Sequence, residues 1–469
     1  MKKTVLLLLM VFAVNIYPAA AFANNLTDTQ ISYSEQSSDV LPELGLLNIL
    51  AITDNVTYNT GERMTRENFA VCAAKMLNLT VSDQNVRYFS DVEQSGYAAG
   101  AINALVELNI ISASPDARFR PAEYITAAEA IKMMICVLGY SEYAEHKGGF
   151  PSGYNALASE LDLTDNVNIQ GEFTQKDAYT VMYNALHTNL YLSTGINKHG
   201  DTVYSKDSET LLGKYYDVHM EEGTVTAVHG QNMNTFGMPD EYSICIDGTM
   251  HRKDERLDAD GFFGGFCKVW FKGDPKKGGS SVIYLAESDD AAKKIEIQSD
   301  LYEDYAENKL SYYISGTSDK VKSTRLKAVN FIYNGTPLLD GYKAAIENIN
   351  KGTITVKDSD GDNIYDLVIL EDYRNFVVGS VNNNIFYNKA DLNDTISLGK
   401  YDAVRIYRGS LGKTDYSEIA AGDVLSVAES ADKTAVKIMV SSAEITAKAE
   451  SVSNDSGKLT VTIEGRNYN

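Results

Sequence analysis

Four aspartates in the segment DSDGDNIYDLVIL have the spacing of a metal-binding loop. They stand at positions 1, 3, 5 and 9 of that segment and are Asp358, Asp360, Asp362 and Asp366. Carboxylate oxygens at alternating positions suit Ca²⁺, which takes roughly six to eight oxygen ligands. Gly361 allows a tight turn, and the apolar run LVIL predicts a strand that holds the loop. The sequence therefore predicts a calcium site, and the alternative is an acidic turn without metal.

The same loop departs from the EF-hand pattern. An EF-hand needs glycine at its sixth position and glutamate at its twelfth, where this chain has Asn363 and an apolar residue of the LVIL run. The segment resembles instead the D-x-D-G-D-x-x-x-D calcium loop of some β-propeller repeats, although the chain carries one copy. Calcium is thus the cofactor that the sequence favours.

Three other segments share one pattern: MTRENFAVCAAKML, ITAAEAIKMMICVL and FTQKDAYTVMYNAL. Each places a threonine after an apolar residue, and these are Thr65, Thr126 and Thr174. Counted from the threonine, offsets +4, +7, +8, +11 and +12 are apolar in all three, which predicts a helix with one buried face. Glu129 and Asp177 stand three residues after their threonines and predict capping interactions. The shared offsets indicate a repeat.

A second helix recurs ahead of these caps. SGYAAGAINALVELNII places Ala98, Ile102, Leu105 and Leu108 on one side, and SPDARFRP then supplies a turn. PSGYNALASELDL repeats this helix before the third cap, and VLPELGLLNIL does so in truncated form before the first. The unit that repeats is therefore a helix, a turn and a capped helix.

The middle copy, residues 88–140, resembles an S-layer homology repeat. It carries F-x-D-V as FSDV, an aromatic–Ala pair, a helix that ends in Ile-Ile, F-x-P as FRP, and ITAAE where the family has I-T-R-A-E. Three copies, at about 41–80, 88–140 and 148–192, are expected. The resemblance implies an all-α, three-pronged spindle. It also implies binding to secondary polymers of the bacterial cell wall, often pyruvylated, in grooves between the prongs.

In this family the arginine after the cap threonine pairs with an anionic group of the sugar. A guanidinium can bind a carboxylate through two parallel hydrogen bonds. Only Arg66, beside Thr65, keeps that residue, since Ala127 and Gln175 replace it in the other two copies. Lys176 would be a partial substitute, because an ammonium lacks the fork of a guanidinium. The resemblance thus assigns polymer binding to one groove centred on Arg66, and the alternative is a solvated arginine at a helix start.

Two further arginines are secondary candidates for polymer contacts. Arg118 and Arg120 flank Phe119 in the turn of the middle copy. Solvated loop charge is the alternative for both. Tyr97 and Ala113 also depart from the usual tryptophan and glycine of the family. These changes leave the apolar offsets intact, so the fold is expected to tolerate them better than the grooves do.

The remainder of the chain has strand patterns. Short β-branched and aromatic runs, bounded by glycine and charge, follow a predicted linker at 193–215. They predict a β-rich domain at 216–300 and a second β-rich region at 301–469, built as small barrels or sandwiches. The final EITAKAESVSNDSGKLTVTIEG resembles 221–248, which predicts a weak internal repeat with a partial last copy. The predicted fold is multidomain: an all-α spindle followed by an all-β region.

The first residues indicate export. Lys2 and Lys3, the apolar run TVLLLLMVFAV and the small residues of AFA predict a signal peptide at 1–23, with a linker at 24–40. An N-terminal membrane anchor is the alternative. No later stretch approaches the ~20 apolar residues of a spanning helix, so no membrane span is expected after cleavage.

Charge and cysteine content restrict the partners further. The formal net charge of −22 argues against nucleic acid, which needs a basic face, and against general attraction to an anionic wall. Cys72 lies on an apolar helical stripe and is expected in a core. Cys245 and Cys267 could pair, although isolated strand cysteines are more often simply buried.

These patterns predict an exported cell-surface protein that is anchored non-covalently to wall polymer and displays an acidic β-region. One alternative is a wall-anchored hydrolase of polysaccharide or peptidoglycan with its site in the β-region. The 64 acidic residues offer too many carboxylate pairs to choose one. Another alternative is structural: an envelope or surface-layer assembly protein that self-associates and has lost polymer binding.

Overall fold

The structure is a computed structural model. It describes most of the chain from residue 61 onward, together with four positions between 44 and 49. The described ranges are 61–79, 88–93, 97–112, 116–196, 202–235, 237–316, 319–349, 351–409, 412–442, 450–455, 458–463 and 466–468. The predicted signal peptide at 1–23 and the predicted linker at 24–40 lie outside them.

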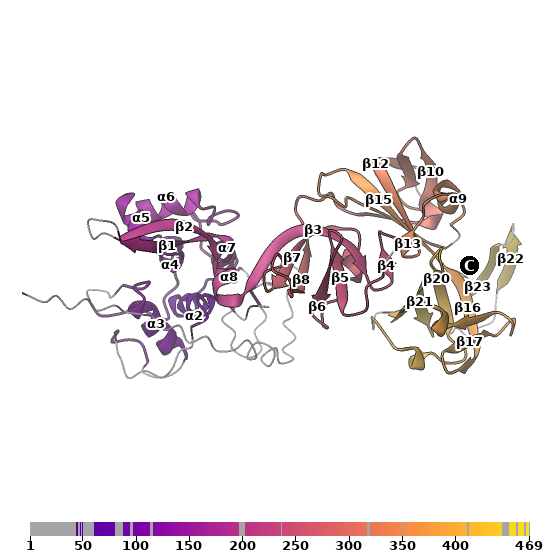
Figure 1. Ribbon diagram of the computed structural model, residues 1–469, viewed down its shortest axis with the longest axis horizontal. Helices are drawn as coiled ribbons and strands as arrows, with labels where there is room; N and C mark the ends of the chain where they lie inside the picture. Colours follow the sequence, from indigo (N-terminus) through magenta and orange to yellow (C-terminus); the bar gives the residue numbers. More distant parts are fainter. Residues whose placement is uncertain are drawn as a thin grey trace, which may run out of the picture. The chain divides into compact units, whose positions relative to one another are not determined.

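The chain divides into two compact units, Met1–Tyr216 (unit 1) and Asp217–Asn469 (unit 2). Unit 1 contains the helices that the sequence predicts, and Figure 1 shows them in indigo to magenta. The helices are α2 (Arg66–Met76), α3 (Tyr97–Glu107), α4 (Ala127–Val137), α5 (Ser141–His146), α6 (Ser152–Glu160), α7 (Gln175–His187) and α8 (Leu211–Tyr216). Within the described residues, unit 1 is therefore mainly helical.

The three predicted cap helices are confirmed as α2, α4 and α7. Thr65, Thr126 and Thr174 are their N-caps, and each side chain accepts a hydrogen bond from the backbone three residues later. Glu129 and Asp177 complete capping boxes in α4 and α7. Every residue at the five predicted offsets of each helix is buried, with at most 8% of its surface exposed. The apolar offsets were thus a reliable guide to the core.

The prediction for α3 is wrong at one position. Ile102 and Leu105 are fully buried, but Leu108 is 44% exposed. The helix ends at Glu107, and the backbone N–H groups of Ile110 and Ile111 both donate to the carbonyl of Leu105. The chain therefore turns before Leu108 can continue the buried side, and the two isoleucines are buried in its place.

The predicted linker at 193–215 has regular structure instead. Strands β1 (Asn189–Ile196) and β2 (Thr202–Thr210) pair antiparallel and are followed by α8. The N–H of Tyr191 donates to the carbonyl of Leu138 at 2.9 Å, and the Tyr191 ring stacks on Tyr140 with centroids 4.7 Å apart. A Cβ on Gly139 would lie 2.2 Å from the Tyr191 carbonyl oxygen, so glycine is required at this approach. Strand β1, which begins before the predicted linker, is thus held against the end of α4.

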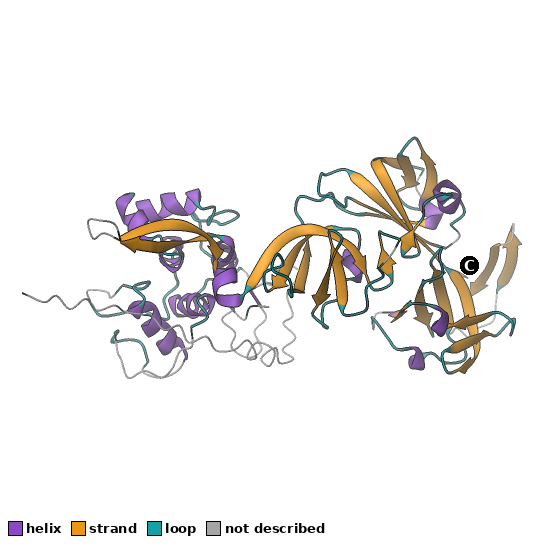
Figure 2. Cartoon of the chain, in the orientation of Figure 1, coloured by secondary structure: helices purple, strands orange, loops and turns teal. Residues whose placement is uncertain are grey.

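Unit 2 is built from β-sheets, shown as orange arrows in Figure 2. The first sheet contains β3 (Val218–Val228), β4 (Gln231–Asn232), β5 (Ser243–Ile246), β6 (Thr249–Lys253), β7 (Phe266–Lys272) and β8 (Ser281–Glu287). Its pairings run β3–β5–β6–β8–β7 and return to β3. Val225, Ile244 and Val269 have no exposed surface in the core of this sheet.

The second sheet begins before the predicted boundary at residue 301. Its strands are β9 (Ile295–Gln298), β10 (Tyr302–Ala306), β11 (Lys309–Tyr313), β12 (Val321–Tyr333), β13 (Thr336–Pro337), β14 (Gly352–Lys357) and β15 (Tyr365–Asp372). A short helix, α9 (Tyr342–Glu347), connects β13 to β14. Ile332, Leu367 and Ile369 of this sheet join the core of the first sheet. The two sheets therefore share buried apolar surface.

The predicted second β-region contains a third sheet with its own core. Its strands are β16 (Arg374–Asn382), β17 (Ile385–Asn388), β18 (Thr395–Ser397), β19 (Ala403–Arg408), β20 (Val424–Glu429) and β21 (Ala435–Ser441). A separate three-stranded sheet follows, made of β22 (Ser451–Asp455), β23 (Lys458–Ile463) and β24 (Arg466–Tyr468). The internal repeat predicted between 221–248 and the final segment stays a prediction.

Cys245 and Cys267 are both buried with free thiols. Cys72 is fully buried in α2, as its apolar stripe predicted. Burial raises the pKa of Cys267 to about 12, so its thiol stays protonated at neutral pH. These three cysteines are therefore small residues of the buried cores.

Candidate functional site

The N-terminal ends of the three cap helices are joined by backbone hydrogen bonds. Arg66 N–H donates to the Glu123 carbonyl at 2.9 Å, and Gln175 N–H donates to the Glu62 carbonyl at 2.6 Å. In both cases the donor directly follows a cap threonine, and the acceptor lies three residues before the cap threonine of another helix. Each of α2, α4 and α7 contacts the other two. The three cap helices are therefore interlocked where the family resemblance places its binding arginine.

Arg66 connects α2 to the turn that precedes α4 and to α4 itself. Its Nε donates to the carbonyl of Phe119 at 2.9 Å, and its Nη1 forms an ion pair with Glu129. The guanidinium carbon lies 5.0 Å from the centroid of the buried Phe119 ring. The side chain keeps 22% of its surface exposed. Arg66 is thus held in one orientation at the junction of two copies, rather than extended into solvent.

These bonds do not exhaust the donors of Arg66. A guanidinium has five N–H groups, and the two bonds to Phe119 and Glu129 leave three for a further acceptor. A guanidinium held by protein contacts loses less side-chain entropy when it binds an anion than a free one does. The arrangement can therefore present a positioned, partly exposed guanidinium to a ligand.

Glu129 has two functions in this site. Its Oε2 accepts from the N–H of Thr126 at 3.0 Å and from the Thr126 hydroxyl at 2.8 Å, while Oε1 faces Arg66. Burial alone would raise the pKa of this carboxyl, but the bonds from Thr126 and the charge of Arg66 outweigh burial and lower it. The capping residue of α4 thus fixes the arginine at the start of α2. The sequence predicted its capping role and missed this second one.

Asp91 organises the turn that carries the other two candidate arginines. It belongs to the FSDV motif, and its two carboxylate oxygens accept from the N–H groups of Phe119 and Arg120 at 2.8 and 2.9 Å. Burial would raise the pKa of Asp91, but these backbone bonds outweigh it and lower the pKa. The Nε of Arg118 lies 3.9 Å from the same carboxylate. The motif aspartate therefore holds the Phe119 carbonyl where Arg66 meets it.

The predicted polymer-binding residues are brought together only in part. Thr65 bridges to Tyr124, close to the turn that carries Arg118 and Arg120. Arg118 is 60% exposed, while Arg120 pairs with Asp116 and lies 3.9 Å from Glu123. Lys176 is exposed on the first turn of α7, and among the described interactions none joins it to Arg66. Arg66, Thr65 and the turn thus form one cluster, and Lys176 lies outside it.

A second feature of unit 1 is a polar cavity of about 510 Å³. It is lined by residues after α3 and by residues of α4, α5 and α6, among them Lys132, Glu145 and Tyr154. Tyr154 donates its hydroxyl to Glu145 at 2.8 Å, and Lys132 Nζ lies 5.2 Å from the ring of the half-exposed Phe150. No motif in the sequence indicates this cavity, because its lining comes from α4, α5, α6 and the segment after α3, which only the fold brings together.

The acidic loop in unit 2 gathers three of its four predicted metal ligands. One carboxylate oxygen each from Asp358, Asp360 and Asp362 lies within 4.8 Å of the others. Asp366 accepts instead from the N–H and hydroxyl of Ser359, at 2.8 and 2.7 Å. The prediction that Asp366 belongs with the other three is therefore not met by this geometry. The strand that follows the loop is confirmed as β15, with LVIL buried.

The comparisons with known proteins agree with the family resemblance. Residues 88–131 match the S-layer homology domain. The "Middle cell wall protein" of Brevibacillus brevis is 24% identical over 393 residues, which cover 76% of this chain and 37% of that protein. The "Surface layer protein" of Brevibacillus choshinensis is 24% identical over 328 residues, covering 64% of this chain and 28% of that protein.

This chain thus spans well under half the length of both relatives. The S-layer homology match thus covers one segment of unit 1, which contains α3 and the start of α4. Together, the domain and the two relatives support a secreted, surface-anchored cell-wall protein. No helix in the described part of the chain has the length and apolar character that crossing a membrane would require.

Proposed function

We propose that unit 1 anchors the protein non-covalently to a secondary cell-wall polymer, and that the acidic β-rich unit is displayed on the cell surface. The observation that carries this proposal is the S-layer homology match at 88–131, which covers α3 and the start of α4, one of the three cap helices that contact one another. The mechanism is recognition of an anionic saccharide by fixed local groups, because the net charge of −22 opposes general attraction to a polyanion. The names of the two relatives favour a role in the cell wall without catalysis.

Unit 1 is proposed to be a three-pronged spindle of three S-layer homology copies. The same cap geometry at Thr65, Thr126 and Thr174, and the mutual contacts of α2, α4 and α7, support this organisation. For the first sheet of unit 2 we propose a small closed barrel, supported by the pairing that returns to β3. On this proposal, the spindle binds the wall polymer and the β-region is displayed on the cell surface.

Arg66 is proposed as the group that pairs with the anionic part of the polymer. Three N–H groups remain beyond its bonds to Phe119 and Glu129, and its side chain is partly exposed. A pyruvylated sugar would supply a suitable carboxylate. Arg118, exposed on the neighbouring turn, is a secondary contact.

A purely structural role in envelope assembly is the second candidate function. It is favoured by Ala127 and Gln175, which remove the arginine from two copies, and by the engagement of Arg66 with Glu129 inside the protein. On this hypothesis Arg66 only fastens two copies to each other. The two functions predict different effects of removing the Arg66 charge from a folded protein. Anchoring predicts weaker wall binding, and a structural role predicts no direct effect on binding.

Co-sedimentation of the full chain with Gram-positive-type wall sacculi separates the two functions. Sacculi would be used with their secondary polymer present and after its chemical removal. If Arg66 contacts the polymer, Arg66→Ala should weaken binding at least about tenfold. Glu129→Gln keeps a capping-box residue while removing the ion pair, so it should leave binding within about threefold of the wild type. Arg325→Ala, at an exposed arginine of β12, is the matched control.

Thermal unfolding of the same variants completes this experiment. If Arg66→Ala and Glu129→Gln lower wall binding and the midpoint temperature of unfolding in the same proportion, the role of Arg66 is structural: it holds α2 against α4. Binding unchanged in Arg66→Ala would move the polymer site to another groove. If the wild-type chain binds sacculi equally well with and without the polymer, or does not bind them, the anchoring proposal is wrong and the structural role in assembly remains.

Calcium binding by the acidic loop is a separate proposal. The convergence of Asp358, Asp360 and Asp362 supports it, and the pKa of Asp366 is raised by its burial and by the nearby charges of Asp360 and Asp358. Hard oxygen donors of this kind would hold a Ca²⁺ ion. Such an ion would reduce the repulsion among the loop carboxylates and stabilise the turn before β15.

Calcium is therefore expected to raise the midpoint temperature of unfolding of the full chain by a few degrees at saturation. Asp360→Asn should abolish that rise, while Asp391→Asn, in a turn of the third sheet, should keep it. Differential scanning calorimetry with Ca²⁺, Mg²⁺ or chelator makes the measurement. An equal response to both ions, or a full response in Asp360→Asn, would count against a calcium site here.

A further inference from the structure

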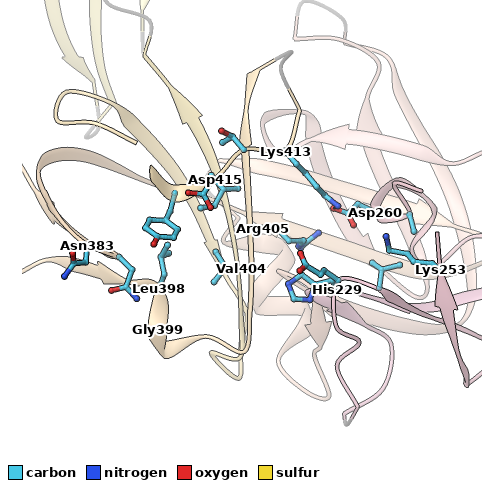
Figure 3. A pocket seen from close by; sticks show the side chains of 17 residues that line it. His229, Lys253, Asp260, Asn383, Leu398, Gly399, Val404, Arg405, Lys413 and Asp415 are labelled. Carbon is cyan, nitrogen blue, oxygen red and sulfur yellow. The ribbon is translucent and has the colours of Figure 1, made fainter. Parts of the chain in front are cut away.

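Unit 2 contains a cavity of about 560 Å³ that no motif in the sequence indicates. It lies between parts of the first sheet, including His229 and Lys253, and parts of the third sheet, including Arg405 and Lys413. In Figure 3 the first-sheet residues lie on one side of the cavity, and Asn383 and Leu398 lie on the other. The volume falls within the roughly 300–1,000 Å³ of small-molecule sites.

Arg405 is the central residue of this cavity. It is only 5% exposed, and its Nε has no hydrogen-bond partner among the residues that the structure describes. A Cβ on Gly230 would lie 2.7 Å from that Nε, and Gly230 has a φ of +77°. The guanidinium thus packs closely against the turn after β3, where a side chain at Gly230 would collide with it. Burying a charged donor without an acceptor is unfavourable, so a ligand acceptor would relieve a real deficit.

The carboxylates nearest to Arg405 are held by other groups. Asp260 accepts from the Tyr407 hydroxyl and lies 3.1 Å from Lys413 Nζ. Glu371 accepts from Lys437 Nζ at 2.6 and 2.9 Å, and Lys437 is the residue registered against Arg405 on the parallel strand β21. Both acidic groups feel the charge of Arg405, but each already has a closer cation. The guanidinium therefore keeps its hydrogen-bonding capacity.

The other lining residues suit a small polar ligand with an apolar side. Asn384, Thr414 and Tyr416 offer amide and hydroxyl groups, while Val404 and Ile406 supply apolar surface. Asp415 accepts from the N–H of Ser417 at 2.9 Å, so part of its acceptor capacity serves that turn. Hydroxyl-bearing molecules fit such a mixture of amides, hydroxyls and aliphatic groups.

We propose that this cavity binds a small sugar that carries an oxyanion, a carboxylate or a phosphate, with the oxyanion on Arg405. A guanidinium is suited to both, because it binds their oxygens through paired hydrogen bonds. Lys413 also lines the cavity, where its ammonium pairs with Asp258 and Asp260. The site is independent of wall anchoring by unit 1, so either proposal can fail without the other.

Isothermal titration of the full chain with glucuronate and glucose 6-phosphate tests the proposal, with glucose as the neutral comparison. Both anionic sugars should bind at least about tenfold more tightly than glucose. Arg405→Met should weaken that binding at least about tenfold, and Arg325→Met, at an exposed arginine of β12, should leave it unchanged. The two anions distinguish a carboxylate from a phosphate source.

Thr414→Trp guards against loss of folding in Arg405→Met. It fills the cavity from a half-buried position and leaves Arg405 in place, so it should abolish binding while thermal unfolding stays close to the wild type. Failure of both anionic sugars to bind would overturn the proposal. So would glucose that binds as well as they do, or binding that survives both Arg405→Met and Thr414→Trp.

Discussion

Replacement of Asn334 by alanine is expected to lower the free energy of unfolding of unit 2 by about 3 kcal/mol. Asn334 is 5% exposed in the turn after β12. Its Nδ2 donates to the carbonyls of Asp372 and Glu429 at 3.2 and 2.8 Å, and its Oδ1 accepts from the N–H of Asp372 at 2.8 Å. Alanine would leave these backbone groups without that partner, and buried unsatisfied groups cost roughly 1–3 kcal/mol each.

Chemical denaturation of the full chain, followed by tryptophan fluorescence, measures this loss. Trp270 is the single tryptophan and is 2% exposed in β7, so the signal reports on unit 2. Asn383→Ala is the matched control, because Asn383 has a similar φ, +52° against +49°, on an exposed turn. The control should lose only the left-handed preference of asparagine, roughly 1 kcal/mol. Equal losses in both variants would show that backbone conformation, and not the hydrogen bonds, is what Asn334 provides.

The sequence was sufficient for the cap helices of unit 1. Helical packing repeats every three or four residues, so apolar offsets identify the buried face without knowledge of the partner. A cap is equally local, since Thr126 and Glu129 satisfy each other's backbone groups within one turn. Both features depend on residues near in sequence, and both are present as predicted.

The partner of Arg66 could not be found in the same way. Glu129 lies 63 residues away, and its pairing with Arg66 requires the copies to interlock. The ITAAE segment held one clue. Its glutamate has two carboxylate oxygens and capping uses one of them, so the other can accept from a cation. The structure also places the Phe119 carbonyl and Asp91 in that junction. Contacts between copies decide the chemistry of the site, and local patterns do not specify them.

For the acidic loop, the sequence predicted the position of three aspartates and not of the fourth. Alternation of aspartates in a turn brought Asp358, Asp360 and Asp362 together, as spacing predicts. Asp366 is different because β15 begins at Tyr365, and an extended strand directs its carboxylate to Ser359. No local pattern could predict the cavity around Arg405, because its lining comes from two sheets that are far apart in the sequence.

Replacement of Lys437 by methionine is expected to lower the free energy of unfolding of unit 2 by about 3–4 kcal/mol at neutral pH. Lys437 and Glu371 are 20% and 18% exposed and lie 2.6 Å apart, and the Tyr373 hydroxyl donates to the same carboxylate at 2.8 Å. Removal of Lys437 leaves Glu371 charged and largely buried. Lys268→Met is the matched control, because Lys268 pairs with the 86% exposed Asp289 and should cost less than about 1 kcal/mol.

The pH dependence tests the cause of this loss. Burial would raise the pKa of Glu371, but the Lys437 charge and the bonds from Lys437 and Tyr373 outweigh burial and lower it. In the wild type, the stabilisation from Glu371 is present above the pKa of the unfolded chain and is lost as pH falls through the lowered folded pKa. In Lys437→Met, burial acts with less opposition, so Glu371 takes up a proton at higher pH and the deficit relative to the wild type shrinks in acid. The double variant Lys437→Met/Glu371→Gln should recover most of the loss at neutral pH. A deficit that is independent of pH and persists in the double variant would point to lost packing of the lysine stem as the cause.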